Sequence, residues 1–187
     1  MNPFSSPKRP QTDNPAAEKL YGAIVAQARL PVFYRDLAVP DTLEGRFLVL
    51  SLTLFGVMHR LKQEREVAVG LAQELADRFA ADMEIVLRES GVGDLSIPKR
   101  MRALATSSAA LLQGYEDALV QGDRAIAGVI AEAFSFEPER IEAAVRERLA
   151  HYLKVMVGAL ETQSFSRLSR GQIVFPRPPA GEAPKGD

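Results

Sequence analysis

Three basic side chains, Lys99, Arg100 and Arg102, follow a turn-forming stretch of the chain within four positions of one another. Lysine and arginine bind anions, because both are positively charged at neutral pH and donate hydrogen bonds to carboxylates and phosphates. In the opening turns of the helix expected there, the helix dipole disfavours cations by about 0.3–1 kcal/mol each. A cluster that breaks this rule is a candidate binding site, unless Asp94, Glu89 or a carboxylate of a neighbouring helix neutralises it.

The stretch before the cluster, residues 91–98, combines helix-stop and helix-start signals. Gly91 follows a long apolar-periodic segment and accepts the positive φ that a helix end requires. Ser96 offers a hydroxyl to cap the next helix, and Pro98 falls in its first turn, where a missing N–H costs nothing. We therefore assign a structural role in the turn to Gly91, Gly93 and Pro98.

Catalytic and metal-binding patterns are missing from the sequence. The two histidines, His59 and His151, have no glutamate three positions before them, so the Glu-x-x-His pairs of di-iron bundles are absent. Zero cysteines exclude disulfides, thiolate nucleophiles and thiolate metal sites. No P-loop, HExxH helix or nucleophile elbow occurs. We expect a protein that is not an enzyme and that holds no metal or cofactor.

Composition is typical of one globular domain without a strong overall charge. The 187 residues are 47% hydrophobic with a net charge of −1, so we expect one core and no nucleic-acid specificity. The longest apolar run, residues 47–58, is shorter than the roughly 20 residues of a membrane span. Residues 1–15 lack the apolar run of a secretory signal. We expect a soluble cytoplasmic protein, with any membrane association peripheral on the inner face.

Apolar residues recur at steps of three and four along most of the chain, without strand alternation. This pattern predicts an all-α, single-domain bundle of about six to seven helices at residues 15–170. We expect a disordered lead-in at residues 1–14 and a disordered, Pro-rich tail at 171–187. In an alternative for the tail, Phe165, Leu168 and the run at 173–175 form a short segment that docks on the body. The expected helices are 15–29, 31–37, 42–64, 68–90, 97–119, a shorter one from Asp123, and 138–162, opened by Pro138.

A break near residues 64–68 is needed, because one helix from Thr42 to Ser90 would be about 70 Å long. The helix before this break is apolar on almost every side between Phe47 and Phe55. Such a helix lies at the centre of a bundle or covers a surface that a partner later occupies, and we favour the centre.

The adjacent aromatic residues Phe33 and Tyr34 lie in the short segment before that helix. Neighbouring positions of one helix cannot both face the core. Either one of the two is an exposed anchor for a partner, or the pair forms a lid over the core.

Residues 79–84 (FAADME) and 87–101 (LRESGVGDLSIPKRM) together resemble the ubiquinol-cytochrome c chaperone family, the bacterial relatives of the mitochondrial assembly factor for cytochrome b. Residues 31–34 (PVFY) and 39–47 (VPDTLEGRF) are similar to the opening segment of that family. The resemblance spans about residues 18–160.

This resemblance implies a chaperone that holds newly made cytochrome b during assembly of the ubiquinol-cytochrome c reductase (bc1) complex. In this interpretation a partly apolar groove receives client helices or loops, while the basic cluster contacts acidic client segments or lipid phosphates. Mitochondrial members carry targeting sequences and work with a small helical partner and the ribosome, and we expect no such leader here. The candidate partner-binding residues are Lys99, Arg100, Arg102, Asp82, Asp94, Phe33, Tyr34 and Arg46, with Asp41 beside them.

An alternative of another class is a ligand-binding or regulatory helical bundle, with a lipid, quinone or haem beneath residues 47–55. His59 is the nearby candidate for a haem ligand, but it falls at the solvated end of its helix. A weak enzyme built from scattered carboxylates is a further alternative, for which no spacing of acidic residues gives specific support.

Overall fold

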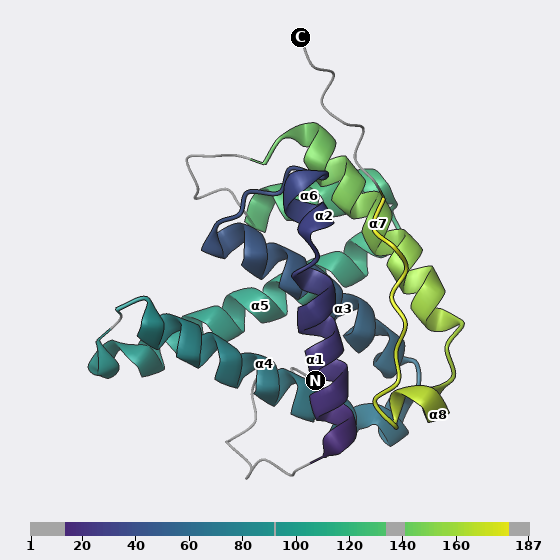
Figure 1. Cartoon of the computed structure of the whole chain (residues 1–187), viewed down its shortest axis with the longest axis horizontal. Helices are drawn as coiled ribbons and strands as arrows, with labels where there is room; N and C mark the ends of the chain where they lie inside the picture. Colours follow the sequence, from purple (N-terminus) through teal and green to yellow (C-terminus); the bar gives the residue numbers. More distant parts are fainter. Residues whose placement is uncertain (1–13, 92, 134–140, 180–187) are drawn as a thin grey trace.

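The computed structural model describes residues 14–91, 93–133 and 141–179. These residues form helices joined by short turns and contain no strand, so the predicted all-α fold is confirmed (Figure 1). Two 3-10 turns, Arg65–Ala68 and Asp94–Ser96, precede α4 and α5. The helices are α1 (Pro15–Ala28), α2 (Pro31–Arg35), α3 (Leu43–Lys62), α4 (Val69–Glu89), α5 (Ile97–Leu119), α6 (Asp123–Ala133), α7 (Ala143–Glu161) and α8 (Phe165–Leu168).

Helix α3 lies at the centre of the bundle, as its all-round apolar sequence predicts. Every residue from Ser51 to Val57 is buried, and α1, α4, α5 and α7 pack around it. Its start is fixed locally, because the Thr42 hydroxyl accepts a hydrogen bond from the Gly45 backbone N–H at 3.2 Å. A Cβ at Gly45 would collide with the Pro40 carbonyl, so only glycine lets the preceding turn approach the helix so closely.

The chain reverses between α3 and α4 at the predicted break. Arg65 adopts a left-handed backbone conformation, with φ at +52°. The turn Arg65–Ala68 then brings α4 back against α1 and α3. Neither glycine nor proline marks this position in the sequence, so only the limit on helix length indicates it.

Helices α4 and α5 form a hairpin whose outer half projects away from the rest of the molecule (Figure 1). We call the described residues 69–91 and 93–119 the arm, and residues 88–91 and 93–102, around its turn, the arm tip. The inner stripe of α4 is buried where the arm meets the body, at Leu71, Leu75, Phe79 and Met83. No helix of the described residues is long and apolar enough to cross a membrane.

The segment after α8 lies along the body, seen in yellow in Figure 1. The Gln163 side chain donates to the Val174 carbonyl at 2.6 Å and accepts from its N–H at 3.0 Å. Ile173 and Phe175 pack against the core. The expectation of a disordered tail is therefore wrong for residues 171–179, and the docking alternative is observed.

Helix α7 begins at Ala143, later than the predicted start at Pro138. Residues 141–142, just before it, are not helical. Pro138 itself lies outside the described residues, as do residues 1–13 of the expected lead-in and residues 180–187.

Candidate interaction surface

The turn at the arm tip is built largely as its residue types predict. Gly91 has a φ of +79°, and Pro98 lies in the first turn of α5. The predicted capping role of Ser96 is wrong, because its side chain makes no capping hydrogen bond. Instead its backbone N–H donates to the Gly93 carbonyl at 2.8 Å, which closes a 3-10 turn that leads into the helix.

The basic cluster lies exposed at the start of α5. Within the described part of the chain, no ion pair reaches Lys99, Arg100 or Arg102. The neighbouring acidic residue is already engaged, because Asp94 accepts from Arg88 at 2.8 Å. Neutralisation of the cluster by Asp94 is therefore not observed, and the three cations face solvent.

Arg88 itself connects the end of α4 to the turn. Its second guanidinium nitrogen donates to Glu84 at 2.8 Å, while the first donates to Asp94. One arginine thus holds two carboxylates of the arm. This bridge fixes the turn relative to α4 and accounts for the position of Asp94.

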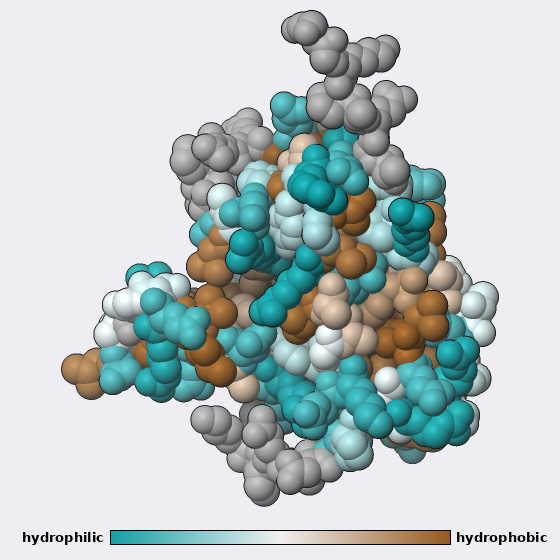
Figure 2. All heavy atoms as spheres, in the orientation of Figure 1, coloured by the Kyte–Doolittle hydropathy of each residue, from teal (hydrophilic) through white to brown (hydrophobic). Residues whose placement is uncertain are grey.

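Apolar side chains accompany the charged ones on the arm. Leu95, in the 3-10 turn, is 99% exposed, and Ile85 on α4 is 53% exposed. Figure 2 shows a recess between the arm and the rest of the molecule, with apolar side chains where the two meet. The partly buried apolar residues that pack against the core include five on α3, α4 and α5: Phe47, Leu50, Val86, Met101 and Leu104.

The aromatic pair of α2 covers one end of the core. Phe33 is 0% exposed and meets the ring of Tyr152 edge-on, with 5.4 Å between the centroids. Tyr34 is half-buried, and its hydroxyl donates to the Ala28 carbonyl at 2.8 Å. This arrangement matches the lid interpretation rather than the exposed-anchor interpretation.

Asp82 and Arg46 are positioned by partners within the chain. Asp82 accepts a hydrogen bond from the Tyr21 hydroxyl at 2.9 Å, which ties α1 to α4. Burial, followed by this hydrogen bond, raises the pKa of Tyr21. Arg46 donates to Asp41 at 2.7 Å at the exposed start of α3, and this bond lowers the pKa of the Asp41 carboxyl.

The structure therefore divides the predicted site. Asp94 and the basic cluster both lie at the arm tip, whereas the other candidates lie on the body or nearer the base of the arm. These separate residues are Phe33, Tyr34, Arg46 and Asp82.

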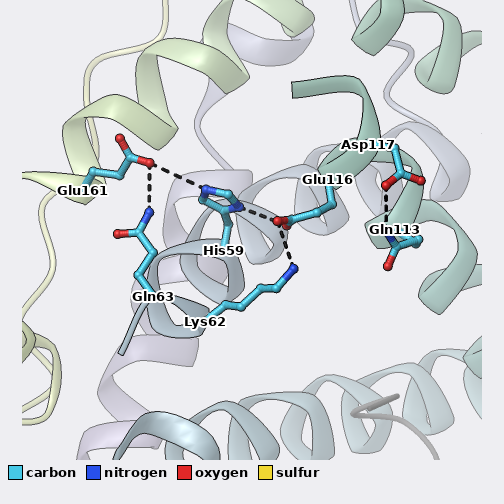
Figure 3. Close-up of polar contacts among 7 residues, drawn as sticks. All are labelled: His59, Lys62, Gln63, Gln113, Glu116, Asp117 and Glu161. Carbon is cyan, nitrogen blue, oxygen red and sulfur yellow. Dashed lines mark hydrogen bonds and ion pairs between the residues drawn. The ribbon is translucent and has the colours of Figure 1, made fainter. Parts of the chain in front are cut away.

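A polar joint links three helices and was not predicted from the sequence (Figure 3). His59 of α3 places Nδ1 2.9 Å from Glu116 of α5 and Nε2 3.6 Å from Glu161 of α7. Lys62 contacts Glu116 at 3.0 Å, and Gln63 donates to Glu161 at 2.9 Å. We call these five residues the His59 joint. Among the described residues, no group of three or more acidic or histidine side chains could hold a metal ion.

The His59 joint bears on the haem alternative and on the charge of Glu116. Both imidazole nitrogens of His59 face carboxylates, so neither is directed at a ligand site. Burial raises the pKa of Glu116, but hydrogen bonds from His59 and Lys62 outweigh burial and leave that pKa below its ordinary value. From the sequence, only the spacing of His59, Lys62 and Gln63 on one helix face could have indicated this joint. Their partners Glu116 and Glu161 are distant in the chain.

Comparison with known proteins identifies the family. The family model described as ubiquinol-cytochrome C chaperone matches residues 35–175, which include the arm, the central helix and the C-terminal segment. The chain belongs to the ubiquinol-cytochrome c chaperone family. The resemblance seen in the sequence is therefore confirmed.

Members of this chaperone family and a solved structure show how far the likeness extends. Ubiquinol-cytochrome-c reductase complex assembly factor 1 of Xenopus laevis is 24% identical over 165 residues, covering 86% of this chain and 80% of that protein. The mouse protein of the same name is 22% identical over 149 residues, 80% of this chain. The chain spans 50% of the length of the mouse and human relatives.

The solved relative is more similar in sequence. The crystal structure of the Cbp3 homolog from Brucella abortus matches with a TM-score of 0.78 and 34% identity. The match covers 87% of this chain and 90% of that one. The likeness therefore extends over nearly the whole described fold.

Proposed function

We propose that this chain is an assembly chaperone for the ubiquinol-cytochrome c reductase (bc1) complex and that its client is newly made cytochrome b. Membership of the chaperone family is the observation that carries the proposal. The name of the Xenopus laevis relative, a reductase complex assembly factor, supports the same complex. The proposal assigns a binding role and no catalysed reaction.

In this proposal the recess beside the arm receives apolar client segments. A membrane protein that has not yet been assembled exposes apolar helices, and a partly apolar surface can cover them. The partly buried side chains of α3, α4 and α5 supply such a surface (Figure 2). The exposed bases of the arm tip contact acidic client segments or lipid phosphates.

The client is an integral membrane protein, so the chaperone acts beside the membrane. We place it peripherally on the inner face, in reach of the translating ribosome. The arm tip projects away from the body (Figure 1). We therefore expect the arm tip to contact the membrane or the client, so that capture of cytochrome b depends on it.

An affinity pull-down tests the proposal directly. The tagged protein is cross-linked in intact cells that translate cytochrome b, recovered, and its partners are identified by mass spectrometry. We expect the native protein to recover cytochrome b and the triple variant Lys99→Glu, Arg100→Glu, Arg102→Glu to lose it, with helicity unchanged by circular dichroism.

A matched control separates local from overall charge. The variant Arg124→Glu, Arg167→Glu, Arg177→Glu changes the net charge by the same amount at exposed positions outside the arm. We expect it to recover cytochrome b normally. Absence of cytochrome b from the native pull-down contradicts the proposed client, and equal loss in both variants contradicts the role of the arm tip.

A further inference from the structure

The most exposed large apolar side chain of the described residues lies at the turn of the arm. Leu95 is 99% exposed, although burying a leucine side chain is favourable. The turn that carries it is held by the Arg88–Asp94 ion pair at 2.8 Å and by the Ser96–Gly93 backbone hydrogen bond. The 3-10 turn Asp94–Ser96 therefore presents this leucine outward.

Three cations follow this leucine at the start of α5. Lys99, Arg100 and Arg102 begin four positions after Leu95, are exposed, and have no ion pair within the described residues. Arg88 engages both Asp94 at the tip and Glu84, one turn earlier on α4, and Glu89 is exposed on the last turn of α4. An outward apolar residue beside long cationic side chains is typical of proteins that bind a bilayer surface peripherally. The long side chains of lysine and arginine reach the lipid phosphates. The apolar residue inserts between the headgroups, at the edge of the acyl chains.

The shape of the tip favours a lipid surface over an acidic protein segment. A protein partner must supply a pocket shaped for a single projecting leucine, whereas lipid headgroups part around it. The arm holds the turn clear of the body, so the body does not obstruct contact with a flat surface (Figure 1). We propose that the arm tip docks on an anionic bilayer surface, with Leu95 inserted and the basic cluster at the lipid phosphates.

The lipid contact specifies how the chaperone would lie on the inner face of the membrane, and its biological role rests on the proposed function. It adds an orientation, in which the turn of the arm points at the membrane and the outer half of the arm separates the recess from the lipid surface. The lipid contact itself requires no cytochrome b.

Vesicle flotation with the purified full chain tests the inference. We expect binding to vesicles of phosphatidylcholine with phosphatidylglycerol and much weaker binding to phosphatidylcholine alone. Binding should weaken as salt rises, because the Debye length falls from about 10 Å at 0.1 M to about 3 Å at 1 M.

Two variants separate the apolar from the charged contribution. The triple variant Lys99→Glu, Arg100→Glu, Arg102→Glu should lower vesicle affinity by at least about a hundredfold, since each cation near an anionic surface contributes about fivefold. Leu95→Ala should lower it by about tenfold without changing its salt dependence. The variant Arg124→Glu, Arg167→Glu, Arg177→Glu should bind vesicles as the native chain does.

The outcomes distinguish this inference from the proposed function. Absence of vesicle binding, or equal binding of native and triple variant, overturns the lipid contact even if cytochrome b is still recovered from cells. Salt-sensitive binding to polyglutamate without vesicle binding reassigns the tip to an acidic protein segment.

A further experiment uses detergent extracts, which contain no bilayer surface. If Lys99, Arg100 and Arg102 contact lipid, the triple variant should capture cytochrome b normally from such extracts, and loss of capture there contradicts the inference. Vesicle binding without cytochrome b recovery by the native chain removes only the proposed client.

Discussion

The hydrogen bond from the Tyr21 hydroxyl to the Asp82 carboxylate joins α1 to the base of the arm at 2.9 Å. Hydrogen bonds to charged groups stabilise by about 1.5–3 kcal/mol, and partial exposure reduces this. We expect Tyr21→Phe to lower the free energy of unfolding by about 1–2 kcal/mol in urea denaturation. Asp82→Ala, which removes the acceptor, should cost a similar amount, and the double variant should cost little more than either single one.

This pair of variants decides between two roles for Asp82. If the carboxylate serves mainly to hold α1 and α4 together, both single variants lose stability alike. If Tyr21→Phe leaves stability unchanged, the hydrogen bond contributes little and Asp82 is free to contact a partner.

The charge of Glu116 makes part of the stability dependent on pH. Its folded-state pKa is lowered, so its contribution is present above the ordinary glutamate pKa of about 4.3 and is lost as pH falls through the folded value. We expect Glu116→Gln to lower the free energy of unfolding at pH 7 by about 0.5–1 kcal/mol. The difference from the native chain should shrink as the pH is lowered below about 4.

The adjacent acidic residue provides a matched control for this prediction. Asp117 is exposed, and its carboxylate accepts from the neutral Gln113 side chain at 2.8 Å (Figure 3). Asp117→Asn removes the same charge one position away without touching the His59 joint, so we expect a smaller loss at pH 7. Equal losses for the two variants would show that overall charge, and not the joint, is responsible.

Contacts within one turn of the chain were predictable, and distant ones were not. The positive φ of Gly91 and the place of Pro98 in the first turn of α5 follow from residue type and position. The pairing of His59 with Glu116 joins residues 57 positions apart, and nothing in either local sequence indicates the other. Local physical chemistry therefore located the ends of helices but not the polar contacts between them.

At the scale of elements, the turn of the arm depends on one glycine conformation. Gly91 has a φ of +79°, which costs a residue with a Cβ about 1–2 kcal/mol. We expect Gly91→Ala to lower the free energy of unfolding by about that amount. Gly93→Ala is the control, because Gly93 has a φ of −60° and open space around the Cβ position.

Thermal or urea denaturation of the two glycine variants gives the comparison. Neither added methyl group meets a neighbouring atom within 4 Å, so only backbone conformation distinguishes them. A loss for Gly93→Ala as large as that for Gly91→Ala would contradict this account of the turn.

Helix positions were predicted better than the segments between and after them. The periodicity of α3 predicted both its extent and its central place, because an all-round apolar helix is buried on every side. The Pro-rich segment at 171–179 has no such periodicity. It is ordered by the Gln163 side chain and by packing of Ile173 and Phe175, which composition alone does not reveal.

At the scale of the whole molecule, the projection of the arm could not be predicted. Apolar stripes on α4 and α5 indicate that the two helices pack, but not how far they extend past the body. The outer half of α5 has few buried residues, since only Ile97 and Ser108 are buried before Tyr115. The exposure of Lys99, Arg100 and Arg102 at the end of a projecting arm is therefore known only from the structure.

The molecule as a whole combines a buried core with a projecting arm. The central helix and the segment after α8 pack in the body, while the arm carries charge and exposed apolar residues away from it (Figure 1, Figure 2). Under the proposed function, the client binds beside the arm and the core of the chaperone stays folded.

Site-specific photo-crosslinking in cells that translate cytochrome b tests the central claim most directly. A photoreactive amino acid replaces Leu104, partly buried on the arm, and in a second variant Val155, 43% exposed on α7. We expect a cytochrome b adduct from position 104 and little or none from position 155. No adduct from position 104, or equal yields from both positions, would contradict the claim that this chain holds cytochrome b beside its arm.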